Sequence, residues 1–213
     1  MEKEAENIVE KVGSLYFKYG IKSITMDDVA KELGISKKTL YNYFTDKSEL
    51  VSSVVDNILN YHTNKSECIF CKNLNAIEEV FEVNNFFTHM LKDYNHSMVY
   101  DLKKYYPDIF KRLHEKRREK MYNSVLNNLK KGKEEGLFRQ EMNEEIISKL
   151  HVSRIEGIFD SNIFTVEEFT SPEFVFEIFN YHIRGIVNEK GLEIVNNKIK
   201  EIKKNQQRWI IWK

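Results

Sequence analysis

The stretch GISKKTLYNYFTDKSEL, residues 34–50, groups lysines, tyrosines, a threonine and an asparagine within one short helical pattern, where surface helices more often carry Glu/Lys pairs. At about 100° per residue, Leu40 and Phe44 face the same way and turn inward. The opposite side then presents cations, hydroxyls and an amide. This mixture suits the phosphates and base edges of DNA, and its members are Lys37, Lys38, Tyr41 and Asn42, with Thr39 and Tyr43 at the flanks.

A second helix precedes this one in the sequence. Thr25 and Asp28 have the spacing of a capping box at its start, and Gly34 ends it. A glycine in a short turn lets two helices cross steeply. The pattern therefore predicts a helix-turn-helix whose second helix enters a major groove with its N-terminal residues foremost. A helix-turn-helix that serves only structure or protein contacts is the alternative.

Composition permits one large domain, or a small domain attached to a larger one. The 213 residues include 41% hydrophobic side chains, and 33 basic and 33 acidic residues give a formal net charge of +0. Bulk charge thus gives no sign of a nucleic-acid partner, so any DNA contact depends on locally clustered lysines.

The rest of the chain has the pattern of long helices. Only two prolines occur, and both precede apolar-periodic stretches as helix starts do. The pattern predicts an all-α protein. After the first helices, which carry apolar residues as far as Leu59, the further helices are expected at roughly 74–93, 97–104, 107–133, 143–160 and 172–189, with one more around 192–202.

The stretch ITMDDVAKELGISKKTLYNYFTDKSEL, residues 24–50, with LYFKYGIKS before it, closely resembles the DNA-binding domain of the tetracycline-repressor (TetR) family. The resemblance covers roughly residues 5–55, and Met26 departs mildly from it, since a small or polar residue is common there. It implies an N-terminal three-helix helix-turn-helix domain, residues 1–48, and a C-terminal helical ligand-binding and dimerisation domain, residues 49–213. By the same resemblance, phosphates are contacted by Thr25, Tyr41, Tyr43 and Lys47, and bases lie nearest to Lys37, Lys38, Thr39 and Asn42.

Two late helices are candidates for a dimer interface. Each carries an apolar stripe and an internal glycine, Gly157 or Gly185, which costs about 1 kcal/mol relative to alanine. A close helix crossing would offset that cost, and a glycine tolerated at the surface is the equal alternative. The interface candidates are Ile147, Leu150, Ile158, Ile178, Phe179, His182 and Ile186.

The middle of the chain is rich in aromatic residues, which line pockets for small molecules but more often form ordinary core. The pocket candidates are Phe87, Met90, Tyr94, Tyr100, Met121, Tyr122 and Phe159.

Cys68 and Cys71 form an isolated C-x-x-C pattern. Zinc needs four ligands and only His62 stands nearby, so two small apolar residues on a partly buried linker are the ordinary interpretation, and no metal site is predicted. A thiol- or metal-responsive regulator remains the alternative, as does one without an effector.

These patterns together predict a sequence-specific transcriptional regulator. We expect a homodimeric repressor on an inverted-repeat, double-stranded DNA operator, released by an unknown small-molecule effector. No glycine-rich phosphate loop or nucleophile elbow occurs, so no enzyme and no cofactor are expected. The acidic start, the two cysteines and the lack of an apolar run of about 18 residues predict a cytoplasmic protein without a membrane partner.

Overall fold

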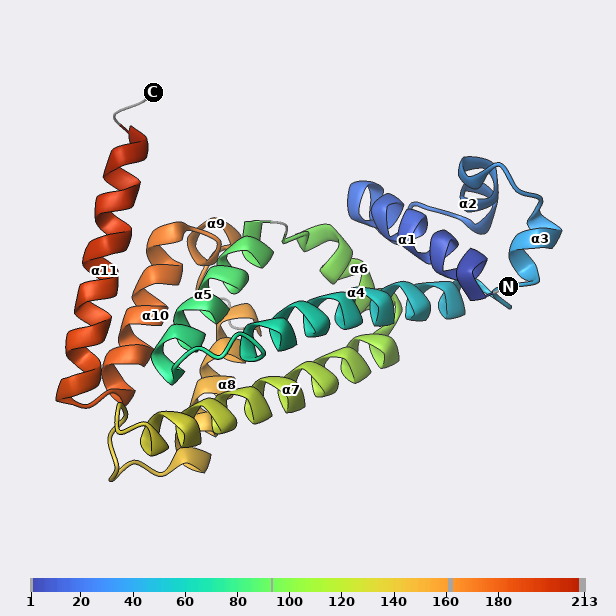
Figure 1. Cartoon of the computed structure of the whole chain (residues 1–213). Coiled ribbons are helices and arrows are strands. Elements are labelled where there is room, and N and C mark those ends of the chain that lie inside the picture. The colour runs from blue at the N-terminus through green and yellow to red at the C-terminus, as the bar shows by residue number, and fades with distance from the viewer. Residues whose placement is uncertain (1, 93, 161–162, 211–213) are drawn as a thin grey trace. The chain divides into compact units, whose positions relative to one another are not determined.

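The computed structural model describes residues 2–92, 94–160 and 163–210, and these ranges are helical almost throughout (Figure 1). Within them there is no β-strand, only an isolated antiparallel bridge between Phe138 and Val187. None of the described helices is long and apolar enough to span a membrane. The elements are α1 (Glu2–Tyr19), α2 (Met26–Leu33), α3 (Lys37–Tyr41), α4 (Lys47–Phe70), α5 (Ala76–Lys92), α6 (His96–Tyr105), α7 (Pro107–Glu134), α8 (Glu144–Asp160), α9 (Val166–Phe169), α10 (Pro172–Ile186) and α11 (Glu189–Ile210).

The all-α prediction is confirmed, and the expected helices are present with small changes of boundary. Two differences matter. First, α4 continues to Phe70, so Cys68 lies in its last turn and not on a linker. Second, the short helix α9 was not predicted. Thr165 and Glu168 form a capping box at its start, and their spacing in the sequence would have indicated it.

The chain divides into two compact units. The first unit comprises Met1–Lys65 and Tyr94–Arg118, and the second comprises Ser66–Asp93 and Glu119–Lys213. Each has its own hydrophobic core. The functional boundary at residue 48 stays a prediction, because the first unit extends beyond the three N-terminal helices to include α6 and parts of α4 and α7.

Local chemistry builds the helix-turn-helix in the first unit. The capping box is present: Thr25 Oγ1 accepts the Asp28 N–H at 3.2 Å, and the Asp28 carboxylate accepts the Thr25 N–H at 2.9 Å. Gly34 has the left-handed φ of 66° that a glycine adopts without strain, and Ser36 caps α3. Leu40, fully buried, anchors α3 to the core as expected.

The second unit packs its core around α5 and α10, which contact each other, while α11 contacts α5. Phe81 and Phe179 meet edge to face across α5 and α10, with ring centroids 4.8 Å apart. Phe138 is fully buried beside Gly132 of α7, where the lack of a side chain makes room for its ring.

Candidate nucleic-acid interface

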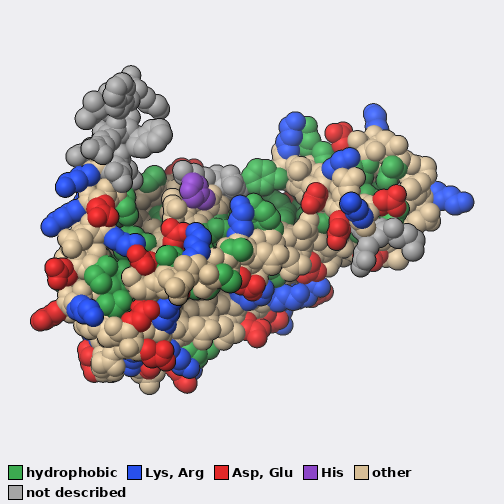
Figure 2. Space-filling view, viewed as in Figure 1, with side chains coloured by type: hydrophobic (Ala, Val, Ile, Leu, Met, Phe, Trp, Pro, Cys, Tyr) green, Lys and Arg blue, Asp and Glu red, His purple; other side chains and the backbone are tan. Residues whose placement is uncertain are grey.

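The outward side of α3 has the expected polar character. Lys37, Lys38 and Asn42 are exposed, and Tyr41 is 48% exposed. Thr39 is half-buried, with its hydroxyl oxygen 2.8 Å from that of Ser36. Figure 2 shows Lys and Arg side chains projecting from the surface that α2 and α3 form. The geometry of α3 thus leaves donors available to a groove.

The two lysines of α3 differ in their electrostatic partners. Lys37 Nζ lies 2.5 Å from the Asp27 carboxylate of α2, but both side chains are about 60% exposed, so this pair adds little stability. Within the described ranges, Lys38 has no ion pair. Lys38 is therefore the lysine of α3 whose charge is not paired with a carboxylate of the described ranges.

Thr25 and Tyr43, both expected at phosphates, already donate to carboxylates. The Thr25 hydroxyl donates to Asp28 at 2.6 Å, which helps to lower the pKa of Asp28. The Tyr43 hydroxyl donates to Glu4 of α1 at 2.8 Å, and this hydrogen bond raises the pKa of Tyr43. A hydroxyl has a single proton to donate, so a phosphate contact at either residue requires that proton to leave its carboxylate.

Lys47, also expected at a phosphate, holds the turn between α1 and α2 in place. Its Nζ donates to the Ile21 carbonyl at 2.7 Å and to the Lys22 carbonyl at 3.4 Å. Partial burial lowers its pKa, and the charges of Asp101 and Asp28 oppose that effect. An ammonium has three N–H donors, so one remains for a phosphate.

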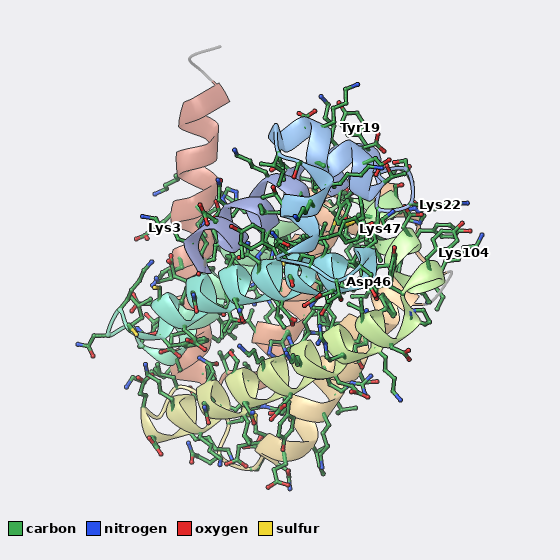
Figure 3. The ribbon with its side chains drawn as sticks, turned by 90° about the vertical axis from the view of Figure 1, so that its right-hand side faces the viewer. Lys3, Tyr19, Lys22, Asp46, Lys47 and Lys104 are labelled. Atoms are coloured by element: carbon green, nitrogen blue, oxygen red, sulfur yellow. The ribbon has the colours of Figure 1, made fainter. Side chains whose placement is uncertain are left out.

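Asp101 of α6 holds the same turn, a role that the sequence patterns did not indicate. Its carboxylate is buried and accepts the Lys22 N–H at 2.8 Å, across 79 residues of sequence. No spacing rule connects residues so far apart. Asp101 and Lys47 together fix the backbone that leads into α2, and Figure 3 shows Lys47 inside the first unit near Lys22.

Replacing Lys47 by alanine should weaken DNA binding by a similar factor for every sequence and make the slope of log affinity against log salt shallower by about 1. The free energy of unfolding should fall by about 1–2 kcal/mol, because two charged hydrogen bonds to the turn are lost. Fluorescence anisotropy at several salt concentrations and urea unfolding measure the two effects. A variant that loses discrimination between operators at an unchanged salt slope would contradict a phosphate contact.

The candidate pocket residues are divided between the two units. Tyr94 and Tyr100 belong to the first unit, and Tyr100 is 51% exposed and accepts a hydrogen bond from Lys104. The other five belong to the second unit, where they are half-buried. The rings of Phe87 and Phe159 meet edge to face at 6.4 Å. Pocket lining therefore stays a prediction, with Phe87 and Phe159 as its coherent part.

The candidate interface residues separate into two sets. Ile158, Phe179 and Ile186 are buried within the second unit and have little surface left for a partner. Ile147, Ile178 and His182 are half-buried, and Leu150 is 60% exposed. Two further large apolar residues of these helices are also exposed, Ile146 of α8 and Tyr181 of α10.

The cysteines are both exposed free thiols, Cys68 in the last turn of α4 and Cys71 just after it. The interpretation as partly buried apolar residues was wrong, because the helix continues further than expected and turns these side chains to its surface. Among the described residues, no group of three or more His, Cys, Asp or Glu side chains could hold a metal ion.

Comparison with known proteins agrees with the geometry of the first unit. Residues 14–54 match the family described as bacterial regulatory proteins, tetR family. The chain is 27% identical over 169 residues to the HTH-type transcriptional regulator YvaF of Bacillus subtilis (strain 168), covering 79% of this chain and 88% of that one. An HTH-type transcriptional regulator of Staphylococcus aureus (strain bovine RF122 / ET3-1) is 42% identical over 55 residues, 26% of this chain and 30% of that one.

Solved structures share the fold over most of the chain. A transcriptional regulator from Cytophaga hutchinsonii ATCC 33406 superposes with a TM-score of 0.75 at 17% identity, covering 87% of this chain and 99% of that one. A regulator from Saccharomonospora viridis, solved in complex with choline, has a TM-score of 0.69 at 16% identity, covering 89% and 100%. The capped helix-turn-helix lies within the matched segment: residues 14–54 of this chain belong to the tetR family of bacterial regulatory proteins, and over most of its length the chain is similar to HTH-type transcriptional regulators.

Proposed function

We propose that this chain is a homodimeric repressor that binds an inverted-repeat operator and leaves it when a small molecule binds. The observation that carries the DNA contact is the exposed face of α3, where the Lys38 ammonium has no carboxylate partner within the described ranges. In this proposal Lys37, Lys38, Thr39 and Asn42 lie nearest the bases, and Thr25, Tyr41, Tyr43 and Lys47 contact phosphates.

Exposed apolar surface on α8 and α10 supports the homodimer. Leu150 and Tyr181 are 60% and 76% exposed, which is costly for large apolar side chains unless a partner covers them. Apart from its chain neighbours and the backbone of its own helix, a Cβ added at Gly157 or Gly185 would meet no atom of the described residues within 4 Å, so a second backbone has room to approach at both. A two-fold interface fixes the spacing of the two copies of α3, which sets the spacing of the operator half-sites.

The effector is proposed for the second unit, in the domain predicted over residues 49–213. The choline complex of the Saccharomonospora viridis regulator shows that this fold holds a small molecule in that protein. Here Phe87 and Phe159 are the core of the candidate lining. An effector releases the operator only to the extent that it binds the released conformation more tightly than the DNA-bound one.

Selection of bound duplexes from a random pool tests this function. We expect the selected sequences to contain an inverted repeat and the complex to sediment as two chains on one duplex. A compound screen for release from the selected duplex then tests the effector. Selected duplexes without any common sequence would overturn sequence-specific binding, and a single chain per duplex would overturn the homodimer.

A pair of half-buried histidines predicts acid sensitivity of the second unit. The rings of His151 (α8) and His182 (α10) lie 4.2 Å apart, and Arg154 Nη2 lies 3.2 Å from His151 Nδ1. Burial, with a smaller contribution from Arg154, lowers the pKa of His151 to about 4, and burial also lowers that of His182. The unfolded chain, with ordinary histidine pKa values, binds more protons as the pH falls below about 6.5.

The free energy of unfolding should therefore fall by about 2 kcal/mol from His151 alone as the pH drops from 7 to 5, and further from His182. Urea unfolding of the native chain and of His151→Gln at both pH values isolates the effect, because the other titrating groups are common to both. An equal pH dependence in the two proteins would show that His151 is not protected from protonation.

A thiol-responsive regulator is the second candidate, and the exposure of both Cys68 and Cys71 favours it. Oxidation to a disulfide would then change DNA affinity. Equal affinities in dithiothreitol and in diamide would exclude this candidate.

A further inference from the structure

Two lysines and two tyrosines converge on the first unit at a place that the proposed function does not use. Lys22 comes from the turn after α1, while Tyr100, Lys104 and Tyr105 come from α6. The ammonium of Lys22 lies 4.8 Å from the centre of the Tyr105 ring, and that of Lys104 lies 5.5 Å from the same ring. Lys104 also donates to the Tyr100 hydroxyl at 2.9 Å. We call these four residues the lysine–tyrosine patch.

The patch carries positive charge without a carboxylate partner. Within the described part of the chain, neither Lys22 nor Lys104 forms an ion pair. Asp101, the acidic residue of α6, is buried and accepts the backbone N–H of Lys22. The hydrogen bond from Lys22 and the charges of Lys104 and Lys22 lower the pKa of Tyr105.

A surface of this composition favours the binding of a chain of phosphates. Two ammonium groups over one ring repel each other, and a bound anion removes that repulsion. Lysine and tyrosine side chains are common donors to DNA phosphates. Tyr100 and Tyr105 are 51% and 38% exposed, so their hydroxyls are accessible to a ligand.

The position of the patch indicates which polyanion it meets. It belongs to the same compact unit as α3, and Lys22 lies in the turn that leads directly to Thr25 and α2. In Figure 3, the side chains of Lys22 and Lys104 project from the same edge of the first unit. A duplex held by α3 is therefore the polyanion nearest to the patch.

We propose that Lys22, Lys104 and their two tyrosines form a second phosphate-binding surface, which holds the DNA backbone outside the half-site that α3 contacts. The proposal rests on the DNA-binding function and adds to it a contact that carries no base specificity. Affinity then depends on the length of duplex beyond the half-sites.

The test compares two duplexes, the selected inverted repeat alone and the same repeat with ten base pairs of arbitrary sequence on each side. Anisotropy titrations at several salt concentrations give the affinity and the salt slope for each. The native protein should bind the longer duplex about 10-fold more tightly, with a slope steeper by about 2 for each protomer. The double variant Lys22→Ala/Lys104→Ala should bind both duplexes equally and match the native affinity for the short one.

Two further variants control for charge. Lys190→Ala/Lys200→Ala removes the same charge from exposed positions of α11 and should keep the length dependence. Lys22→Arg/Lys104→Arg should also keep it. Equal affinity of the native protein for the two lengths would overturn this inference alone, whereas failure to bind either duplex would overturn the DNA-binding function as well. A double alanine variant that weakens both duplexes equally would contradict a contact outside the half-site.

Discussion

Replacement of Gly132 by alanine should lower the free energy of unfolding of the second unit by about 2–3 kcal/mol. The added Cβ would lie 2.1 Å from Cδ2 and 2.3 Å from Cε2 of the Phe138 ring, far inside van der Waals contact. The gain in helix propensity from glycine to alanine is about 1 kcal/mol at most and does not offset such a clash. This glycine is therefore a packing requirement of α7.

The size of the effect depends on whether Phe138 can withdraw, and its backbone is held on both sides. Its N–H donates to the Gly132 carbonyl at 3.0 Å. The next residue, Arg139, donates its N–H to the Ile186 carbonyl at 3.0 Å, and Asn188 donates to the Leu137 carbonyl at 3.1 Å. The ring is also fully buried. Relief must come from a shift of α7 itself, which disturbs the core around it.

Urea unfolding followed by circular dichroism measures this prediction. Gly13→Ala in α1 is the matched control, because its new Cβ would lie 3.6 Å from Val54 Cγ1, an ordinary contact. That variant should be neutral or more stable by up to about 1 kcal/mol. If Gly132→Ala unfolds at the native midpoint, the ring of Phe138 is not held where the structure places it.

The parts of the fold that the sequence predicted correctly are those fixed by local chemistry. The capping box of Thr25, the left-handed Gly34 and the buried Leu40 each depend on residues within one or two helical turns. The ties that Asp101 and Lys47 make to the α1–α2 turn depend on long-range packing instead. Residue spacing carries no information about such contacts.

The predicted dimer interface shows a second limit of what apolar periodicity can predict. An apolar stripe indicates which side of a helix avoids water, but not whether its own chain or a partner covers that side. Phe179 and Ile186 are covered by their own unit, whereas Leu150 and Tyr181 are not covered by it. The same ambiguity affects the aromatic residues, since Tyr100 is 51% exposed in the first unit whereas Phe87 is half-buried in the second.

The double variant Lys38→Ala/Asn42→Ala should lose about 100-fold or more in affinity for the selected operator. Both side chains are exposed, one in α3 and one directly after it. A lysine donates to guanine O6 or N7 and an asparagine pairs with adenine N6 and N7, and each good contact contributes about 1–3 kcal/mol of discrimination. Binding to random duplexes should fall much less, because only the lysine charge contributes there.

Anisotropy titrations against the selected operator and a random duplex give the two affinities and their ratio. Asn7→Ala/Lys11→Ala is the matched control, since it removes the same two side-chain types, four residues apart and exposed, from α1 of the same unit. It should leave the ratio unchanged, because a lost charge that contacts no base weakens both duplexes alike. If Lys38→Ala/Asn42→Ala instead lowers both affinities by one common factor, these side chains contact only the backbone. The base contacts must then come from Lys37 or Thr39, whose present partners are Asp27 and Ser36.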